Sequence, residues 1–472
     1  MKLKLNDIVM ATKGASSCAN RDELITGVST DSRSIVAGTV FFALKGPRFD
    51  GHAFVRDVLR KGAVAAVVKE HAAVDLAASL EAAPLIVVKD TLASLGNLAS
   101  YVRRLHGTPV AAISGTAGKT TTKEMLAAIL KRSRRVLKTE GNKNNLIGLP
   151  LTLMELDESF DAAVVELGIS EFYEMQRLVE ICVPDVAVIT NIGRAHLATL
   201  GDIEGVARAK APLFTALPPT AVRVVNLDDP RVVKSAQGGK NIVTYSLNQD
   251  ADVRARKYTV DKGFESIEVI YDVRGAEVKI RFPSPSMAYV VNGAAALAAA
   301  LPFGAKTDEM IAGLNGFQPI YGRMSEWRSQ GVTLLDDTYN ANPESVASAL
   351  RTLALAKGRR VAVIGAMLEL GEAAVEEHAA VGRMAASLGI DMLVTVGALA
   401  SAAGRSALEA GMNKESVLSF KDNAAAGEGL KEAIESGDTV LVKGSRGALL
   451  EEVAEGIKRF VAGDATRRFV GH

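Results

Sequence analysis

The chain has 472 residues, of which 48% are hydrophobic and 23% charged, and its formal net charge is +1. This length is enough for roughly two to four domains with buried cores, and the balanced charge gives no reason to expect nucleic acid or an anionic membrane as a partner. The two cysteines, Cys18 and Cys182, are too few for a disulfide framework or a zinc site, and the opening MKLKLNDIVMATKGAS lacks the apolar core of a signal peptide, so we expect a cytoplasmic protein.

Residues 1–107 alternate short strand and helix patterns, which predicts a first α/β domain. TVFFAL and AVAAVV are typical of strands, and FVRDVLRKG is typical of a helix closed by glycine. Two polar clusters lie beside these strands: STDSR at 29–33 and KGPRFDGH at 45–52. Asp, Ser and Gly favour turns, so turn chemistry alone accounts for both clusters.

The strongest motif is PVAAISGTAGKTTTKEMLAAIL at 109–130, a β-branched strand pattern, a tight turn and a helix with one apolar face. Gly115 and Gly118 let successive N–H groups of the turn point at one anion, and the helix N-terminus adds its positive end. Lys119 would reach the β- and γ-phosphates of a nucleotide, and the Thr120 hydroxyl would bind Mg²⁺. Because the spacing is the shorter G-x-x-G-K-T, an ordinary βα turn that carries a lysine is the alternative.

Two near-continuous apolar runs follow, DAAVVELG at 161–168 and PDVAVITNIG at 184–193, as buried parallel strands require. Ligands of an open parallel sheet bind outside the carboxyl ends of its strands, which is where Glu166, Asn191 and His196 fall. A carboxylate and an imidazole beside a phosphate loop suit Mg²⁺ or its water shell. For His196, a surface role is the alternative.

The next part of the chain changes character. GDIEGVARAKAPLF at 201–214 predicts a helix, on which Arg208 and Lys210 are by themselves ordinary solvated charges. Between about 220 and 290 the strands ESIEVIYDV and AEVKIRF, joined by a glycine turn, predict an antiparallel annex to the central sheet. The alanine-rich run at 294–301 is too short to span a bilayer, so we expect a buried helix and no membrane insertion.

A third block begins near residue 319 and repeats a pattern of strand followed by helix, which predicts a second doubly wound α/β domain. Its expected strands lie in GVTLLDDTYNANPESV, RRVAVIGAMLELGE, DMLVTVGA and DTVLVKGSRG. Polar residues follow these strands, namely Asp336, Asp337, Asn340, Asn342, Glu369, Lys443, Ser445 and Arg446. Two α/β domains with charged strand ends predict a cleft that closes over a nucleotide.

Together these motifs resemble the Mur ligases. The resemblance rests on GTAGKTTTKEM, GNKNNLIGLPLTL, ELGISEFYEM, NIGRAHL, EGVARAKAPLF, DDTYNANPES, MLELGE and LVKGSRG, which run in the family's order over nearly the whole chain. DDTYNANP and MLELGE are most similar to the branch that adds D-alanyl-D-alanine to a UDP-muramoyl tripeptide. The resemblance implies three α/β domains: a UDP-sugar-binding domain at 1–107, a P-loop ATPase-like domain binding ATP and Mg²⁺ at 108–318, and a Rossmann-like domain at 319–472 that closes over ATP and binds the dipeptide.

The resemblance also implies roles for individual residues. The nucleotide would be bound by Gly115, Thr116, Ala117, Gly118, Lys119, Thr120, Thr121, Asn292, Arg323, Asp337 and Asn340. Two Mg²⁺ ions would be held by Thr120, Glu166, His196 and Lys210, with Lys119, Lys210 and His196 catalytic. The UDP-sugar substrate would contact Ser29, Asp31, Ser32, Arg33, Lys45, Gly46, Asp50, Gly51, His52, Asn144 and Asn145. Lys210 matches a lysine that family members carbamylate, which requires a site that disfavours its charged form, since only a neutral amine adds CO₂.

The implied activity is ATP-dependent amide ligation in peptidoglycan synthesis, through an acyl phosphate and with release of ADP and phosphate. The expected partners are small molecules only (ATP, the UDP-muramoyl tripeptide and D-alanyl-D-alanine), and we expect a monomer. Another Mur-type ligase, a folylpolyglutamate-type ligase, or a P-loop ATPase without a ligated product are the alternatives. The chain departs from the family pattern at Ala211, Pro212, Val291, Ala295 and Ala366, none of which is a phosphate or metal group.

Overall fold

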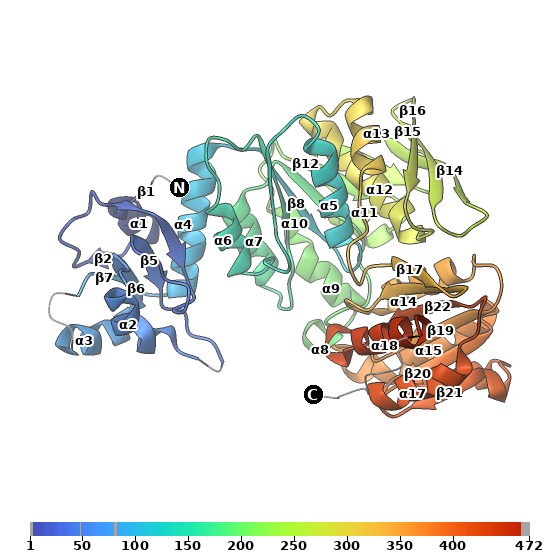
Figure 1. Ribbon diagram of the computed structural model, residues 1–472. Helices are drawn as coiled ribbons and strands as arrows, with labels where there is room; N and C mark the ends of the chain where they lie inside the picture. Colours follow the sequence, from blue (N-terminus) through green and yellow to red (C-terminus); the bar gives the residue numbers. More distant parts are fainter. Residues whose placement is uncertain (1–2, 48, 80–82, 464–472) are drawn as a thin grey trace.

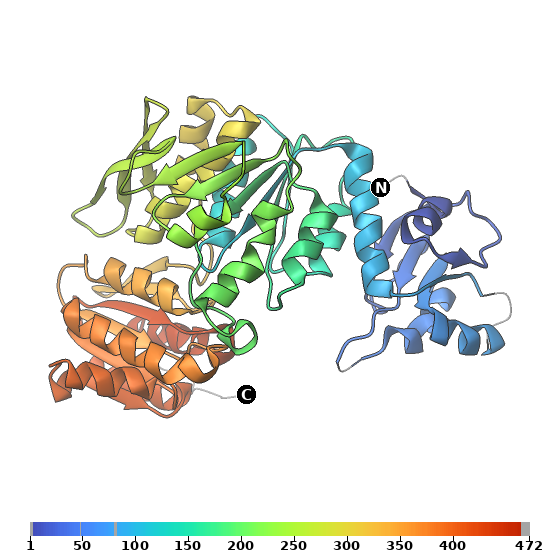
Figure 2. The ribbon, with the colours of Figure 1, turned by 180° about the vertical axis from the view of Figure 1, so that it is seen from behind.

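The computed structural model describes residues 3–47, 49–79 and 83–463, and it consists of three α/β domains (Figures 1 and 2). In Figure 1 the N-terminal domain is blue, the central domain runs from cyan to yellow, and the C-terminal domain is orange to red. The central domain lies between the other two. The three-domain α/β architecture predicted from the motifs is confirmed.

The N-terminal domain is built on a five-stranded sheet in the order β2-β7-β6-β5-β4, parallel except for the edge strand β2. The expected strands TVFFAL and AVAAVV form β5 and β6, and FVRDVLRKG contains α2, so these predictions are confirmed. The strands are β1 (Leu3–Lys4), β2 (Ala15–Ser16), β3 (Leu24–Ile25), β4 (Gly27–Ser29), β5 (Thr39–Phe42), β6 (Ala65–Lys69) and β7 (Leu85–Val88). The helices are α1 (Leu5–Thr12), the 3-10 helix η1 (Gly51–Phe54), α2 (Val55–Arg60), α3 (Glu70–Ser79) and α4 (Thr91–His106).

The central domain is organised around a nine-stranded sheet in the order β16-β15-β14-β13-β12-β11-β8-β10-β9. Side chains of β8 alternate between two hydrophobic cores: Val110 and Ala112 face the core of α6, α7 and α9, whereas Ala111 and Ile113 face the core of α5 and α12. A strand covered on both faces needs the continuous apolar sequence seen here. The strands are β8 (Val110–Ser114), β9 (Val136–Lys138), β10 (Ala162–Glu166), β11 (Val186–Ile189), β12 (Val222–Asn226), β13 (Ile242–Ser246), β14 (Val253–Val260), β15 (Ile267–Val273) and β16 (Ala276–Phe282).

The antiparallel annex is smaller than expected. Only β14, β15 and β16 pair in antiparallel fashion, whereas β12 and β13 continue the parallel sheet from β11. The expectation was wrong for residues 220–250 because the helix between β12 and β13, α11 (Pro230–Ser235), is too short to leave a helical pattern in the sequence. The glycine turn itself is confirmed: Arg274 and Gly275 have φ of 50° and 88°, as a two-residue hairpin requires.

The alanine-rich segment lies in α12, where Ala294 to Ala300 are fully buried between α5 and the sheet, so the expected buried helix is confirmed. Within the described part of the chain, no helix combines the length and the apolar character that crossing a bilayer requires. The helices of this domain are α5 (Lys119–Leu130), α6 (Gly148–Leu153), α7 (Glu174–Cys182), α8 (Leu197–Leu200), α9 (Ile203–Lys210), α10 (Pro212–Thr215), α11, α12 (Met287–Ala300), η2 (Leu301–Phe303) and α13 (Thr307–Asn315).

The C-terminal domain has a six-stranded sheet in the order β17-β18-β22-β19-β20-β21, parallel except for the edge strand β17. The repeated pattern of strand and helix in the sequence predicted this arrangement. The strands are β17 (Ser325–Ser329), β18 (Val332–Asp337), β19 (Arg360–Ile364), β20 (Met392–Val396), β21 (Val417–Phe420) and β22 (Thr439–Lys443). The helices are α14 (Pro343–Leu353), η3 (Gly371–Ala373), α15 (Ala374–Ser387), α16 (Ser401–Glu409), η4 (Lys414–Ser416), α17 (Asn423–Ala433), η5 (Arg446–Ala448) and α18 (Glu451–Val461).

Helix α4 joins the first two domains, because it packs against α1 and also against α6 and α7. Its buried Arg103 donates to the carbonyl oxygens of Cys182 (3.1 Å) and Val183 (3.2 Å) and to the carboxylate of Asp185 (2.7 Å). Arg103 therefore supplies hydrogen-bond donors to the last carbonyl oxygens of α7, and its bond to Asp185 connects α4 to the start of β11.

Replacing Arg103 by alanine is expected to lower the free energy of unfolding by about 2 kcal/mol, because two backbone carbonyls lose their donor. The midpoint of urea unfolding measures this. Arg104→Ala is the matched control on the same helix, since Arg104 is exposed and its loss should leave the midpoint nearly unchanged. Equal midpoints for the two variants would contradict the assignment.

Candidate functional site

The turn between β8 and α5 has a backbone that only glycine fits at two positions. Gly115 has a φ of 144°, and a Cβ there would lie 1.9 Å from Oγ1 of Thr190. Gly118 has a φ of 84°, and a Cβ there would lie 2.3 Å from Oδ1 of Asn292. The turn therefore packs directly against β11 and α12, and α5 begins at Lys119 with its first N–H groups free of partners within the helix.

Asn191, at the carboxyl end of β11, holds the turn in shape. Its backbone oxygen accepts from the N–H of Thr116 (3.0 Å), and its Oδ1 accepts from the N–H of Ala117 (2.9 Å). The Thr116 hydroxyl in turn donates to the carbonyl of Gly193 (3.1 Å). The carboxyl ends of β8 and β11 are thus locked together, as expected for neighbouring parallel strands.

Two lysine amines meet at the carbonyl oxygen of Gly115. Nζ of Lys119 donates to it at 2.9 Å and Nζ of Lys210 at 3.2 Å. Lys210 is buried, and burial together with the charge of Lys119 lowers its pKa well below the usual value. Burial also lowers the pKa of Lys119, partly offset by Glu166. Lys210 therefore lies where its charged form is disfavoured, which is the condition that carbamylation requires.

The unusual residues after Lys210 do not disturb its position. Helix α9 ends at Lys210, and α10 begins with Pro212 at its first turn, where a missing N–H costs nothing. The N–H of Ala211 still donates to the carbonyl of Ala207 at 2.9 Å.

Glu166 is buried at the carboxyl end of β10, and both of its oxygens face polar partners. Oε2 accepts from the Thr120 hydroxyl (2.7 Å), and Oε1 accepts from Nδ2 of Asn144 (2.8 Å). Among the described residues, no three His, Cys, Asp or Glu side chains come together as a closed metal cage. One carboxylate beside a threonine hydroxyl at the phosphate loop fits Mg²⁺, because that ion takes few protein ligands and completes its shell with phosphate oxygens and water.

His196 caps α8 with a φ of 55° and lies between the central and C-terminal domains. Its Nδ1 is 2.5 Å from Oε2 of Glu369 in the C-terminal domain. The imidazole of a central-domain residue is therefore paired across the domain boundary.

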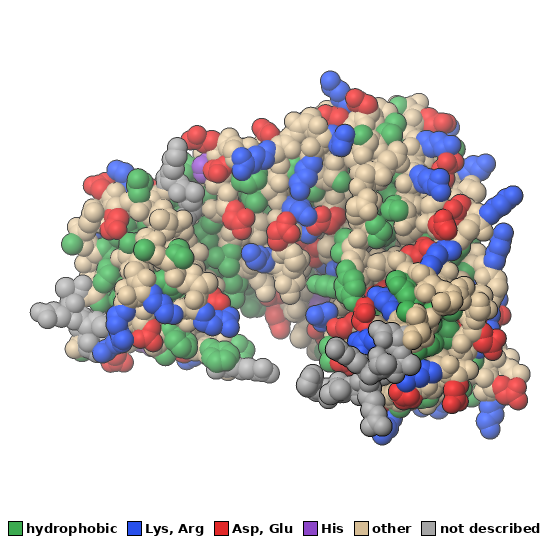
Figure 3. All heavy atoms as spheres, in the orientation of Figure 1, with side chains coloured by type: hydrophobic (Ala, Val, Ile, Leu, Met, Phe, Trp, Pro, Cys, Tyr) green, Lys and Arg blue, Asp and Glu red, His purple; other side chains and the backbone are tan. Residues whose placement is uncertain are grey.

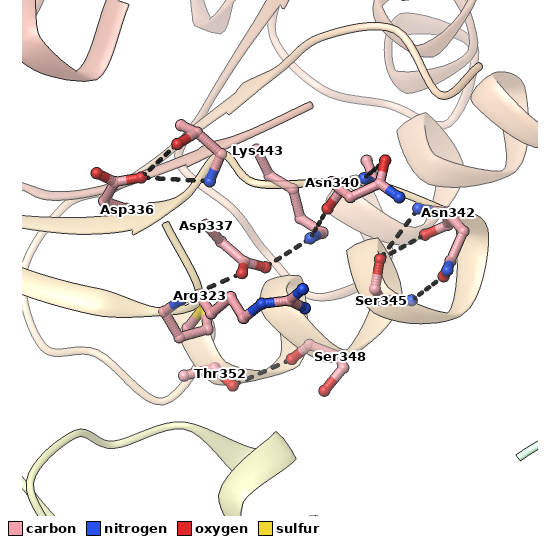
Figure 4. Close-up of polar contacts among 12 residues, drawn as sticks. Arg323, Asp336, Asp337, Asn340, Asn342, Ser345, Ser348, Thr352 and Lys443 are labelled. Atoms are coloured by element: carbon pink, nitrogen blue, oxygen red, sulfur yellow. Dashed lines mark hydrogen bonds and ion pairs between the residues drawn. The ribbon is translucent and has the colours of Figure 1, made fainter. Parts of the chain in front are cut away.

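The C-terminal domain contributes a buried ion pair (Figure 4). Nζ of Lys443 donates to Oδ2 of Asp337 (2.6 Å) and to the carbonyl of Asn340 (2.9 Å). Burial raises the pKa of Asp337, and Lys443 opposes this effect. The guanidinium of Arg323 lies over the ring of Tyr339, 4.1 Å from its centroid.

A cavity of about 620 Å³ between the two domains gathers these groups, a volume typical of small-molecule sites. Of the predicted residues, its lining includes Thr116, Ala117, Gly118, Lys119, Thr120, Thr121, Asn144, Asn145, Glu166, His196, Lys210, Asn292, Arg323, Asp337 and Asn340. Gly115 contacts the site through its carbonyl oxygen, which accepts from Nζ of Lys119. The structure thus brings together fifteen predicted residues from separate stretches of the sequence between Thr116 and Asn340.

The predicted substrate residues of the N-terminal domain lie elsewhere: none of its described residues lines this cavity. They make contacts among themselves, including Arg33 to Asp31 (2.7 Å) and His52 Nδ1 to Asp50 (2.5 Å). The bond to Arg33 lowers the pKa of Asp31 to about 2. Figure 3 shows the molecule hollowed between the N-terminal and C-terminal domains. Ser29, Ser32, Lys45, Gly46 and Gly51 belong to the same two segments.

Arg194 is a residue that sequence reasoning missed. Its guanidinium pairs with Glu344 (3.1 Å) and with Glu377 (3.1 Å), both in the C-terminal domain. Nδ2 of Asn342 also donates to the carbonyl of Thr116 at 3.3 Å. Partners 150 or more residues apart leave no local pattern in the sequence, so no signal could have revealed these contacts.

Family models match three successive parts of the chain. The Mur ligase family catalytic domain matches residues 24–103, the Mur ligase middle domain matches 113–300, and the Mur ligase glutamate ligase domain matches 322–446. Each matched region covers most of one of the three large sheets.

Curated proteins and solved structures give the same result. The UDP-N-acetylmuramoyl-tripeptide--D-alanyl-D-alanine ligase of Escherichia coli (strain K12) is 35% identical over 93% of this chain and 94% of its own. The enzyme of the same name from Bacillus subtilis (strain 168) is 33% identical over 96% of this chain and 98% of its own. MurF from Acinetobacter baumannii superposes with a TM-score of 0.88 at 32% identity, covering 97% of this chain and 99% of that one. MurF ligase from Thermotoga maritima in complex with ADP superposes with a TM-score of 0.84 at 28% identity, covering 93% of this chain and 98% of that one.

Proposed function

The chain belongs to the Mur ligase family, and from this we propose that it uses ATP to join D-alanyl-D-alanine to UDP-N-acetylmuramoyl-tripeptide in peptidoglycan synthesis. The observation that carries the proposal is the cavity in which the glycine turn with Lys119 faces the Asp337–Lys443 pair of the next domain. Relatives named for this reaction align over more than nine tenths of the chain.

The reaction follows from charge. A carboxylate is a poor acylating agent, so the terminal carboxylate of the tripeptide attacks the γ-phosphorus of ATP, and ADP leaves. The ammonium of Lys119 and the N-terminus of α5 stabilise the negative charge on the transferred phosphoryl group. The amine of the dipeptide then attacks the acyl carbon, loses its proton, and phosphate leaves as the amide forms.

The chain's own residues fit Mg²⁺. Thr120 would hold one ion, and Glu166 and His196, with the carbamate of Lys210, would hold a second. When bound, the metal supplies a Lewis acid that neutralises phosphate charge. Lys210 meets the requirement for a carbamate through its burial beside Lys119.

An acyl phosphate is destroyed by water, which gives domain closure a chemical purpose. The pairs of Arg194 with Glu344 and Glu377 hold the two domains together around the cavity. Arg323 and Tyr339 would contact the nucleotide from the C-terminal side.

The remaining assignments are also part of this proposal. Residues 1–107, 108–318 and 319–472 would act as the UDP-sugar, ATP and dipeptide domains, with the clusters at 29–33 and 45–52 contacting the UDP-sugar. The protein would act as a monomer in the cytoplasm. Cys18 and Cys182 are both buried free thiols, which suits a reducing compartment.

The test is phosphate release from ATP with UDP-muramoyl tripeptide, run with and without D-alanyl-D-alanine, with mass spectrometry of the product. Release that needs both substrates and gives a pentapeptide product is the expected result. Release without the dipeptide would favour an ATPase, and release with a single amino acid would favour another ligase of this family.

A further inference from the structure

A loop of the C-terminal domain, residues 366–371, reaches across the domain boundary to His196. Besides the contact of Glu369 with Nδ1 of His196, the carbonyl of Glu369 accepts from the N–H of Ala198 at 3.1 Å. Gly371 packs so closely on α8 that a Cβ there would lie 3.2 Å from Cα of Ala198. The loop therefore fits the start of α8 through its side chain, its backbone and its glycine.

This loop is held in place from within its own domain by His378, a buried residue that the proposed reaction does not use. Nε2 of His378 accepts from the N–H of Met367 (2.9 Å), and its Nδ1 donates to the carbonyl of Ala374 (2.6 Å). The N–H of Leu368 donates to Oγ of Ser445 at 2.9 Å. Burial lowers the pKa of His378, so the neutral ring that these two bonds require is favoured. These hydrogen bonds hold the backbone of the loop in place, and with it the position of Glu369.

The pairing has a chemical consequence for His196. A neutral imidazole that gives its Nδ1 proton to a carboxylate keeps the lone pair on Nε2, and the carboxylate makes that nitrogen a better ligand. A carboxylate behind a histidine is the usual way in which proteins orient a metal-binding imidazole. Here the histidine and the carboxylate come from different domains.

We propose that Glu369 is a positioning residue, delivered by closure of the C-terminal domain, that orients His196 toward the divalent cation bound with the nucleotide. This inference rests on the proposed function, because that function assigns His196 to the metal. It implies that the cation site is complete only when the domains are closed, so that binding of the second ion and closure favour each other.

A simple latch is the competing explanation, in which Glu369 only holds the domains together. The chain offers a matched control, because Glu377 forms an ion pair across the same boundary, with Arg194 and not with His196. Glu369→Ala and Glu377→Ala each remove one carboxylate from this boundary. Glu369 is 62% exposed, so its loss should leave folding intact.

The experiment measures Mn²⁺ binding by electron paramagnetic resonance in the full chain with a non-hydrolysable ATP analogue. Glu369→Ala is expected to weaken the binding of one Mn²⁺ about ten-fold. Glu377→Ala should change it less than about two-fold, because Arg194 keeps its ion pair with Glu344 and the domains still close. In a His196→Ala background, adding Glu369→Ala should cause no further loss, because the carboxylate acts through the imidazole.

Unchanged Mn²⁺ binding in Glu369→Ala would overturn the inference. If Glu377→Ala weakened Mn²⁺ binding as much as Glu369→Ala does, Glu369 would only hold the domains together. If Glu369→Ala weakened Mn²⁺ binding further in the His196→Ala background, Glu369 would act independently of His196. Because no amide is formed in this assay, its outcome is separate from that of the phosphate-release assay. If the variants changed Mn²⁺ binding as expected but the protein made no pentapeptide, the proposed function would be wrong and the positioning role of Glu369 would stand.

Discussion

Replacing Lys119 by alanine is expected to lower kcat by about 10³-fold, the scale seen when a charge-stabilising donor is removed from an active site. Nζ of Lys119 lies at the glycine turn, where it donates to the carbonyls of Gly115 (2.9 Å) and Thr116 (3.3 Å). It is the first residue of α5, whose N-terminus would receive phosphate. Steady-state phosphate release with both acceptor and dipeptide measures the loss.

Lys131→Ala is the matched control, because Lys131 is exposed at the other end of the same helix. Its kcat should match that of the unmodified enzyme. Circular dichroism should show that both variants fold. Ligation at a normal rate in Lys119→Ala would contradict the site assignment.

Replacing Lys210 by alanine is expected to lower activity about 100-fold, with partial recovery on adding acetate or formate. The size follows from the loss of a group that acts on the metal ion. Because the amine is buried and its pKa is lowered, it can add CO₂ and become a carbamate, and a small carboxylate would replace that anion. Activity as a function of carboxylate concentration measures the recovery.

Lys119→Ala provides the comparison for this prediction, since a carboxylate cannot replace its positive charge and should restore nothing. Full activity of Lys210→Ala without any added carboxylate would remove the carbamate from the mechanism. Equal recovery in both variants would show a nonspecific salt effect.

Most of the site could be predicted because its groups follow buried strands. Apolar runs such as those of β8 and β10 leave strong patterns, and the carboxyl ends of parallel strands meet at one edge, so Lys119 and Glu166 had to lie near each other. The strand ends of the third block also gave Asp337 and Asn340. The resemblance to the family then supplied Arg323 and the nucleotide-binding role of all three, whose place in the cavity depends on how two domains meet.

What could not be predicted depends on long-range geometry. The two contacts of Arg194 and the pairing of His196 with Glu369 join surfaces that are unrelated in sequence. The parallel course of β12 and β13 was missed for another reason: a six-residue helix such as α11 carries too few residues to show a period.

Helix α4 sets the distance between the N-terminal and central domains in this structure. It spans 16 residues, about 24 Å at 1.5 Å per residue, and packs against both the N-terminal and the central domain. On the proposed function, the sugar end of the substrate binds in the N-terminal domain on one side of α4, and the reacting carboxylate binds in the central domain on the other. A peptide one residue shorter would reach about 3.5 Å less far toward the phosphate. We therefore expect the length of the acceptor, and not only its chemistry, to affect the rate of ligation.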